Sequence, residues 1–123
     1  MTRKRRSQRL RRVDEVVRQV VADALLEQND QRVRAVVVTG VEVSADTAYA
    51  DVYVQLAGND HRRERSLEAL EKVRPRIQAR VNEEMHLRLT PVLRFRIDET
   101  FDHAMRIERL LAENPPLPEQ QEG

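Results

Sequence analysis

A long helical stretch, residues 60–85, separates the third strand-like segment of this chain from the first two, and this spacing restricts the fold more than any other feature. The first two segments, 35–43 and 48–56, are joined by the turn sequence SADT, which predicts an antiparallel hairpin. The third segment, 90–98, follows a crossover long enough to allow a parallel pair. The pattern therefore predicts a three-stranded mixed sheet.

Helical spacing of apolar residues also marks a stretch before the sheet, 8–28, and a stretch after it, 101–113. Pro75 lies in the middle of the 60–85 stretch. Because proline removes a backbone donor and clashes with the preceding turn, it must kink this helix or divide it in two. We therefore predict an α+β fold with the order α-β-β-α-kink-α-β-α.

Three consecutive valines, 36–38, indicate a first strand that is covered on both faces and lies at the centre of the sheet. The expected strand order is then 2-1-3, with the third strand parallel to the first. The second strand alternates apolar and polar residues, which is typical of a half-buried strand. The helices should gather on the face to which the apolar strand residues point, namely Val37, Val41, Val52, Val54, Leu93 and Phe95.

The 123 residues suffice for one domain, which we place at 8–112 between a flexible basic arm, 1–7, and a disordered, acidic, proline-rich tail, 113–123. The absence of cysteine excludes disulfide scaffolds and thiolate metal sites. No apolar run approaches a membrane span, and no secretory signal is recognisable. We therefore expect a monomeric cytoplasmic protein.

The formal net charge of +1 hides a strong segregation of charge along the chain. Of 22 basic residues, seven lie within residues 1–12, which contain no acid, so 15 basic and 21 acidic residues are left for the rest. A basic end on an otherwise acidic domain is typical of proteins that bind a polyanion. The basic residues of this segment are Arg3, Lys4, Arg5, Arg6, Arg9, Arg11 and Arg12, of which we expect the first four to make no core contact.

Catalysis finds little support in the sequence. The histidines, His61, His86 and His103, lie in different predicted elements and lack the spacing of metal ligands. The serines have no nucleophile motif around them, and the 3 glycines form no phosphate-binding loop. We therefore expect no enzyme activity, no cofactor, no metal and no small-molecule substrate.

Two further candidate sites for nucleic acid accompany the basic N-terminal segment. The kink lies in KVRPRIQAR, a segment without an acid, where a helix that restarts at the proline would present free amides to a phosphate. Its candidate residues are Lys72, Arg74, Pro75, Arg76 and Arg80. The open sheet face carries Tyr49, Tyr53, Arg94 and Arg96, a set that suits base stacking. The plainer alternatives are a solvated tail, a surface helix bent by proline, and tyrosines that only shield the sheet.

Several segments between about residues 8 and 112 carry a family resemblance: QRLRRVDEVVRQVVADALLEQ, GVEVSADTAYADVYVQL, LRLTPVLRFRIDET and RIERLL. On these segments the chain resembles the ribosome-binding factor A family, which acts in maturation of the bacterial small ribosomal subunit. The resemblance implies a type II KH-like fold that binds the immature 30S subunit and its 16S rRNA, assisting late maturation and rRNA processing without catalysis. The chain departs from the family where Val73, Arg74 and Pro75 replace an alanine–any–glycine kink, and where Asp51 replaces a common lysine.

Two other functions remain open from the sequence. One is a protein–protein adaptor that uses the open sheet face or the acidic tail. The other is a general single-stranded RNA-binding module of KH-like fold. Salt dependence of binding separates the RNA-binding functions from the adaptor.

Overall fold

The computed structural model describes residues 6–85 and 90–113. Within these ranges the order of elements is α1 (Gln8–Leu26), α2 (Gln31–Arg34), β1 (Val37–Val43), β2 (Tyr49–Gln55), α3 (Asp60–Glu84), β3 (Val92–Ile97) and α4 (Glu99–Glu113). This order confirms the predicted one and adds α2, a single helical turn that is too short to produce a periodic pattern. The predicted arm, except for its last two residues, and the predicted tail, except for its first, lie outside the described residues.

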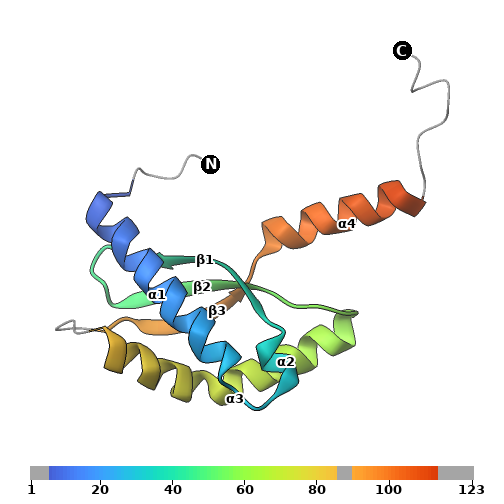
Figure 1. Ribbon diagram of the computed structural model, residues 1–123. Coiled ribbons are helices and arrows are strands. Elements are labelled where there is room, and N and C mark those ends of the chain that lie inside the picture. The colour runs from blue at the N-terminus through green and yellow to red at the C-terminus, as the bar shows by residue number, and fades with distance from the viewer. Residues whose placement is uncertain (1–5, 86–89, 114–123) are drawn as a thin grey trace.

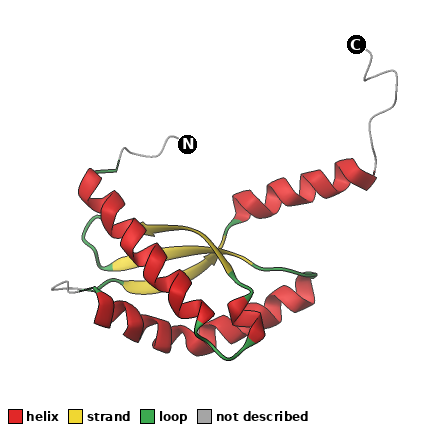
Figure 2. Cartoon of the chain, viewed as in Figure 1, coloured by secondary structure: helices red, strands yellow, loops and turns green. Residues whose placement is uncertain are grey.

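The three strands form one mixed sheet, and α1 and α3 cover one of its faces (Figures 1 and 2). The core between these layers is almost entirely aliphatic. Its largest fully buried side chains come from both helices and from all three strands, and include Leu25, Leu70, Ile77, Val52 and Leu93. Full burial of a side chain of this kind contributes about 1.5–3 kcal/mol.

The central strand is β2, so the predicted strand order 2-1-3 is wrong and the order is β1-β2-β3. The hairpin of β1 and β2 is antiparallel, as predicted. The parallel partner of β3 is β2, not β1. A run of valines indicates a central strand only where both faces are covered, and here helices cover one face alone. A central strand of such a sheet keeps the alternating pattern that β2 has.

An irregularity in β1 explains why its valine run does not mark a strand covered on both faces. The register with β2 shifts between Val38 and Gly40, which marks a β-bulge. Before the bulge Val36 is buried, and beyond it Val43 is buried, whereas Val37 points away from the core and is 52% exposed. The prediction that Val37 faces the helices is therefore wrong, because one extra residue reverses the alternation.

Helix α3 continues through Pro75 instead of ending there. Figure 1 shows that α3 changes direction in its middle part, so the proline bends the helix without dividing it. Because the helix does not restart, the predicted free amides at Pro75 are not formed. The bend keeps both halves against the core, with Leu70 buried before the proline and Ile77 buried after it.

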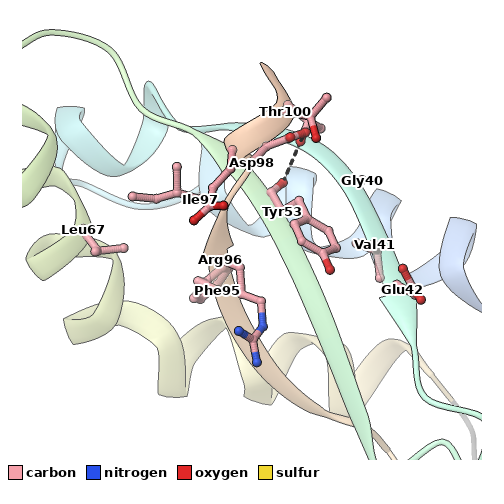
Figure 3. A pocket seen from close by; sticks show the side chains of 12 residues that line it. Gly40, Val41, Glu42, Tyr53, Leu67, Phe95, Arg96, Ile97, Asp98 and Thr100 are labelled. Carbon is pink, nitrogen blue, oxygen red and sulfur yellow. Dashed lines mark hydrogen bonds between the residues drawn. The ribbon is translucent and has the colours of Figure 1, made fainter. Parts of the chain in front are cut away.

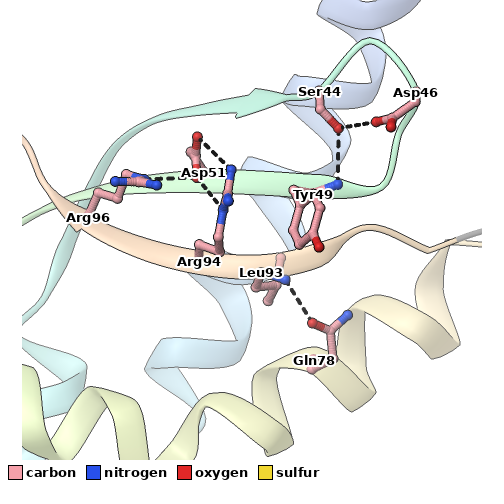
Figure 4. A network of polar contacts seen from close by, with 8 residues as sticks. All are labelled: Ser44, Asp46, Tyr49, Asp51, Gln78, Leu93, Arg94 and Arg96. Carbon is pink, nitrogen blue, oxygen red and sulfur yellow. Dashed lines mark hydrogen bonds and ion pairs between the residues drawn. The ribbon is translucent and has the colours of Figure 1, made fainter.

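Side chains cover both edges of the sheet by imitating a neighbouring strand. On the β3 side, the Gln78 amide donates to the carbonyl of Pro91 at 2.9 Å and accepts from the N–H of Leu93 at 2.9 Å (Figure 4). On the β1 side, Asp14 Oδ1 accepts from the N–H of Val43 at 2.8 Å, and Arg6 donates to the carbonyl of Val43 at 2.8 Å. Such cover satisfies edge groups that would otherwise pair with another chain.

Replacing Gln78 with leucine is expected to lower the free energy of unfolding by about 1–3 kcal/mol, because two backbone groups at a strand edge lose their partners. Urea unfolding followed by circular dichroism measures this change. The matched control is Asn82→Ala, which removes only the exposed 3.0 Å contact between the two side chains and should cost under about 0.5 kcal/mol. Equal effects of the two substitutions would contradict the strand-mimicking role of Gln78.

Helix α4 does not join the other helices on the sheet and extends away from it (Figure 1). Its apolar residues therefore remain 42–55% exposed, namely Met105, Ile107, Leu110 and Leu111. The first turn of α4 is attached to α3 by an ion pair between Asp102 and Arg63. The apolar face of the sheet is covered mainly by α1 and α3.

Candidate nucleic-acid interface

Arg6, which lies in the described part of the basic arm, is bound to the domain. The Arg6 guanidinium forms two contacts of 2.8 Å with the carboxylate of Asp14 and lies 3.9 Å from Glu42. Both partners of the main pair are mostly buried, with 18% and 15% of their side chains exposed. The prediction that Arg6 makes no core contact is therefore wrong, and this cation is neutralised by its own domain. Arg3, Lys4 and Arg5 lie outside the described residues.

The first turns of α1 carry the basic residues that remain available. Arg9, Arg11 and Arg12 are exposed, and none of them takes part in the hydrogen bonds or ion pairs found in residues 6–85 and 90–113. Ser7 begins the helix, and its hydroxyl accepts from the N–H of Leu10 at 3.1 Å. A regular helix therefore displays these three guanidinium groups near the end of the sheet at which β1 stops.

At the kink, the structure separates paired cations from free ones. Arg74 lies 3.3 Å from Glu71, and Arg80 bridges Glu27, the C-cap residue of α1, at 2.7 Å and Glu84 at 3.1 Å. These two arginines are therefore paired with acids of their own domain. Lys72 and Arg76 are exposed and take part in no ion pair within the described ranges, so they are the cations that the kink offers to a phosphate.

The open face of the sheet brings Tyr49, Arg94 and Arg96 together, but one carboxylate offsets part of the charge of the two arginines. The guanidinium of Arg94 lies 4.5 Å above the ring of Tyr49, a cation–π arrangement. Arg94 and Arg96 both donate to one carboxylate oxygen of Asp51, at 2.9 and 3.0 Å (Figure 4). This contact raises the pKa of Arg96, chiefly through the side-chain hydrogen bond. Both arginines are therefore held on a carboxylate instead of facing solvent alone.

Asparagine at position 51 is expected to strengthen binding of unstructured RNA severalfold, because it removes the charge that holds two arginines. The salt dependence should steepen by about 0.7 in log–log slope for each phosphate newly contacted. Fluorescence anisotropy with a labelled oligonucleotide at several salt concentrations measures both effects. Glu64→Gln, which removes an exposed charge on α3, is the matched control. If the two variants bind alike, the sheet face contributes no specific contact.

A cavity of about 890 Å³ lies where β3 ends beside the bulge of β1 (Figure 3). Thr39 Oγ1 lies there, 2.6 Å from Asp98 Oδ2 and 3.3 Å from the carbonyl oxygen of Tyr53. The charged lining residues in the described part of the chain are Glu42, Asp98 and Glu99, with Arg96 as the one cation. An excess of carboxylates repels phosphate, so this cavity does not extend the nucleic-acid interface.

Residues 6–85 and 90–113 contain neither a group of side chains suited to bind a metal ion nor a helix suited to span a membrane. No group of three or more His, Asp or Glu side chains that could hold a metal occurs in those ranges. In the same ranges no helix combines the length and apolar character needed to cross a bilayer. His86, one of the histidines named above, lies outside the described residues.

The candidate residues thus fall on two sides of the sheet. The α1 arginines and the α3 kink belong to the helical layer, and the first turn of α1 and the last turn of α3 flank the same end of the sheet in Figure 1. Arg94 and Arg96 project from the opposite face, since their neighbours Leu93 and Phe95 point to the helices. Sequence reasoning grouped residues by type, but it missed the acids that neutralise several of them.

The sequence model of the family described as Ribosome-binding factor A matches residues 9–111. A protein of that name from Macrococcus caseolyticus (strain JCSC5402) is 37% identical over 108 residues, which cover 87% of this chain and 95% of that protein. Another from Rhodopirellula baltica is 39% identical over 107 residues, covering 86% of this chain and 78% of that protein.

Solved structures are similar in fold. The crystal structure of ribosome-binding factor A from Thermus thermophilus has a TM-score of 0.64 at 23% identity, covering 72% of this chain and 94% of that chain. A homology model of the Thermus thermophilus factor, fitted into the cryo-EM map of a complex with the 30S subunit, has a TM-score of 0.57 at 24% identity. It covers 68% of this chain and 88% of that chain.

Proposed function

We propose that this chain, which belongs to the ribosome-binding factor A family, binds the small ribosomal subunit and its 16S rRNA while that subunit is being assembled. The family match and the curated relatives cover most of the chain, and the Thermus thermophilus relative has been fitted into the map of a 30S complex. The protein acts in the cytoplasm, where ribosomes are assembled. It acts by binding and has no catalytic activity of its own.

The observation that carries this proposal is the set of free cations on α1. Arg9, Arg11 and Arg12 are exposed and have no partner within the described ranges, whereas Arg6, Arg74 and Arg80 are each paired with a carboxylate. Guanidinium groups bind phosphate oxygens through paired N–H donors. A helix that carries three of them suits the phosphate backbone of folded rRNA, which is recognised largely by shape and charge.

We propose that binding of this kind serves late maturation of the subunit and rRNA processing. A small domain that contacts phosphates on the immature subunit stabilises one arrangement of the rRNA. It then leaves when the mature arrangement removes its site. Because the contacts are ionic, affinity falls as salt rises.

Two alternative functions predict different partners. A general single-stranded RNA-binding module would bind any unstructured RNA as tightly as it binds the subunit. An adaptor would use the open sheet face or the acidic tail, and α4 adds a further apolar surface through its exposed Ile107, Leu110 and Leu111. Adaptor binding through apolar surface would change little with salt.

The test is sedimentation of the full chain with purified ribosomal particles through sucrose gradients, at salt between about 50 and 200 mM. We expect the protein to sediment with free small subunits, to be nearly absent from 70S ribosomes, and to dissociate as salt rises. Equal sedimentation with bulk RNA would favour the general RNA-binding module. Salt-independent association with a protein component would favour the adaptor.

A further inference from the structure

A second basic site lies on the described surface, away from α1 and the kink. A cavity of about 480 Å³ opens between α2 and the first two turns of α3. Cavities of a few hundred cubic ångströms are large enough for a small organic ligand. We call this cavity the arginine pocket. Its lining residues are Gln31, Arg32, Ala35, Val36, Leu56, Ala57, Arg62, Arg65 and Ser66.

The charged lining of the arginine pocket is basic. Among the described residues it contains Arg32, Arg62 and Arg65 and no carboxylate. Arg62 and Arg65 are exposed and have no ion-pair partner within the described residues. Two acids lie close by: Asp30 binds the guanidinium of Arg32 at 2.8 and 3.1 Å, and Glu68 interacts with the same group at longer range. The pocket therefore keeps two free guanidinium groups beside one that is already oriented.

The floor of the arginine pocket is apolar. Val36 and Leu56 are 8% and 5% exposed, and they close the pocket from the side of the core. Ala35 and Ala57 add small side chains at its walls. An apolar floor next to arginines suits a ligand that is flat and apolar at one end and anionic at the other. The Ser66 hydroxyl adds a group that can donate to a ligand or accept from it.

The loop before α3 restricts one of the two free arginines. Gly58, in the loop before α3, has a φ of +98°, a region that residues with a side chain rarely adopt. A Cβ at this position would lie 2.9 Å from the Cβ of Arg62. The absence of a side chain at Gly58 therefore lets the loop press against the stem of Arg62, which limits the directions that its guanidinium can take.

We propose that the arginine pocket binds a nucleotide, with the base on the floor of Val36 and Leu56 and the phosphate on Arg62 and Arg65. A free nucleotide and an unpaired nucleotide of an RNA chain present the same chemistry to this pocket. The site goes beyond the proposed function, because none of its residues belongs to α1 or to the kink.

The test is a titration of the isotopically labelled full chain with mononucleotides, a short single-stranded RNA and inorganic phosphate, followed by NMR and calorimetry. We expect mononucleotides to shift the amide signals of Ala35, Ala57 and Ser66 and to bind more tightly than phosphate. The Arg62→Gln, Arg65→Gln double variant should bind about ten-fold more weakly or worse, because charge-assisted contacts to the phosphate are lost.

The matched control is the Arg106→Gln, Arg109→Gln double variant, which removes two exposed arginines of α4 that do not line the pocket. Its dissociation constant for nucleotides should stay within about two-fold of that of the parent. This change is well below the ten-fold loss expected for the pocket variant. Tighter binding of the RNA than of mononucleotides identifies an RNA chain as the source of the ligand, and the reverse identifies a free nucleotide. The proposal is overturned if phosphate binds as tightly as nucleotides, if the pocket signals do not shift, or if both double variants bind alike. None of these measurements involves ribosomal subunits, so they fail or succeed independently of the proposed function.

Discussion

The Asp14→Ala variant is expected to lose about 2–4 kcal/mol in free energy of unfolding, a large share of the stability of a domain this small. Asp14 accepts from the N–H of Val43 at 2.8 Å and holds the Arg6 guanidinium through two contacts of the same length. Alanine leaves a strand-edge N–H without a partner and a mostly buried guanidinium without its anion. Urea unfolding by circular dichroism measures the change.

Two further variants separate the contributions of Asp14. Asp14→Asn keeps an oxygen that can accept from Val43 but loses the charge, so it should destabilise the protein less than alanine does. Arg6→Gln removes the cation alone, and a double-mutant cycle with Asp14→Ala gives the interaction energy of the pair. If Asp14→Ala costs under about 0.5 kcal/mol, as an ordinary surface substitution does, the pair does not protect the edge of the sheet.

Local periodicity is enough to predict the long helices and the strands, because each depends on residues close in sequence, but it misses the single turn of α2. The order of strands depends instead on which faces are covered. The alternating pattern of β2 is typical of any half-buried strand and does not show whether that strand lies at the centre or at an edge. The valine run of β1 was therefore the only signal for a central strand, and it indicated the wrong one. The bulge between Val38 and Gly40 could not be predicted from the valine run, since an inserted residue leaves no mark in composition.

The same reasoning explains what was missed at the candidate site. Several acids that pair with the basic residues lie far away in sequence: Arg80 pairs with Glu27, and Arg94 and Arg96 pair with Asp51. A search for segments without acids finds cations but not the carboxylates that the fold brings to them. The arginine pocket had no sequence signal, because α2 and α3 contribute its residues from separate segments.

Asp30 illustrates a local arrangement that persists at low pH. Its carboxylate binds the side chain of Arg32 and also caps α2, and these contacts lower its pKa from 3.8 to about 2. Because the pKa is lower in the folded protein, the cap contributes its stabilisation above the ordinary pKa and loses it as pH falls through about 2. At neutral pH Arg32 is therefore held in place beside the arginine pocket.

Glutamine at positions 9, 11 and 12 is expected to weaken association with the free small subunit by about one to two orders of magnitude at moderate salt. Each phosphate contact that is lost should lower the log–log salt slope by about 0.7 to 0.9. The fold should be unaffected, because the three side chains are exposed and have no partner in the described ranges. Sedimentation with subunits at several salt concentrations measures the slope, and thermal unfolding checks the fold.

The comparison with the kink decides which part of the helical layer contacts the rRNA. Lys72→Gln with Arg76→Gln removes the free cations of α3, while Arg74→Glu disrupts a pair with Glu71 that already neutralises its charge. If α1 provides the main contacts, its triple variant loses more affinity and more slope per charge removed than the α3 double variant. A larger loss of affinity in the α3 variant would place the interface at the bend. Pro75→Ala, which straightens the helix, would then lower affinity for the subunit as much as the loss of charge does. Parent-like binding by both variants would contradict the proposal that free cations of the helical layer bind the subunit.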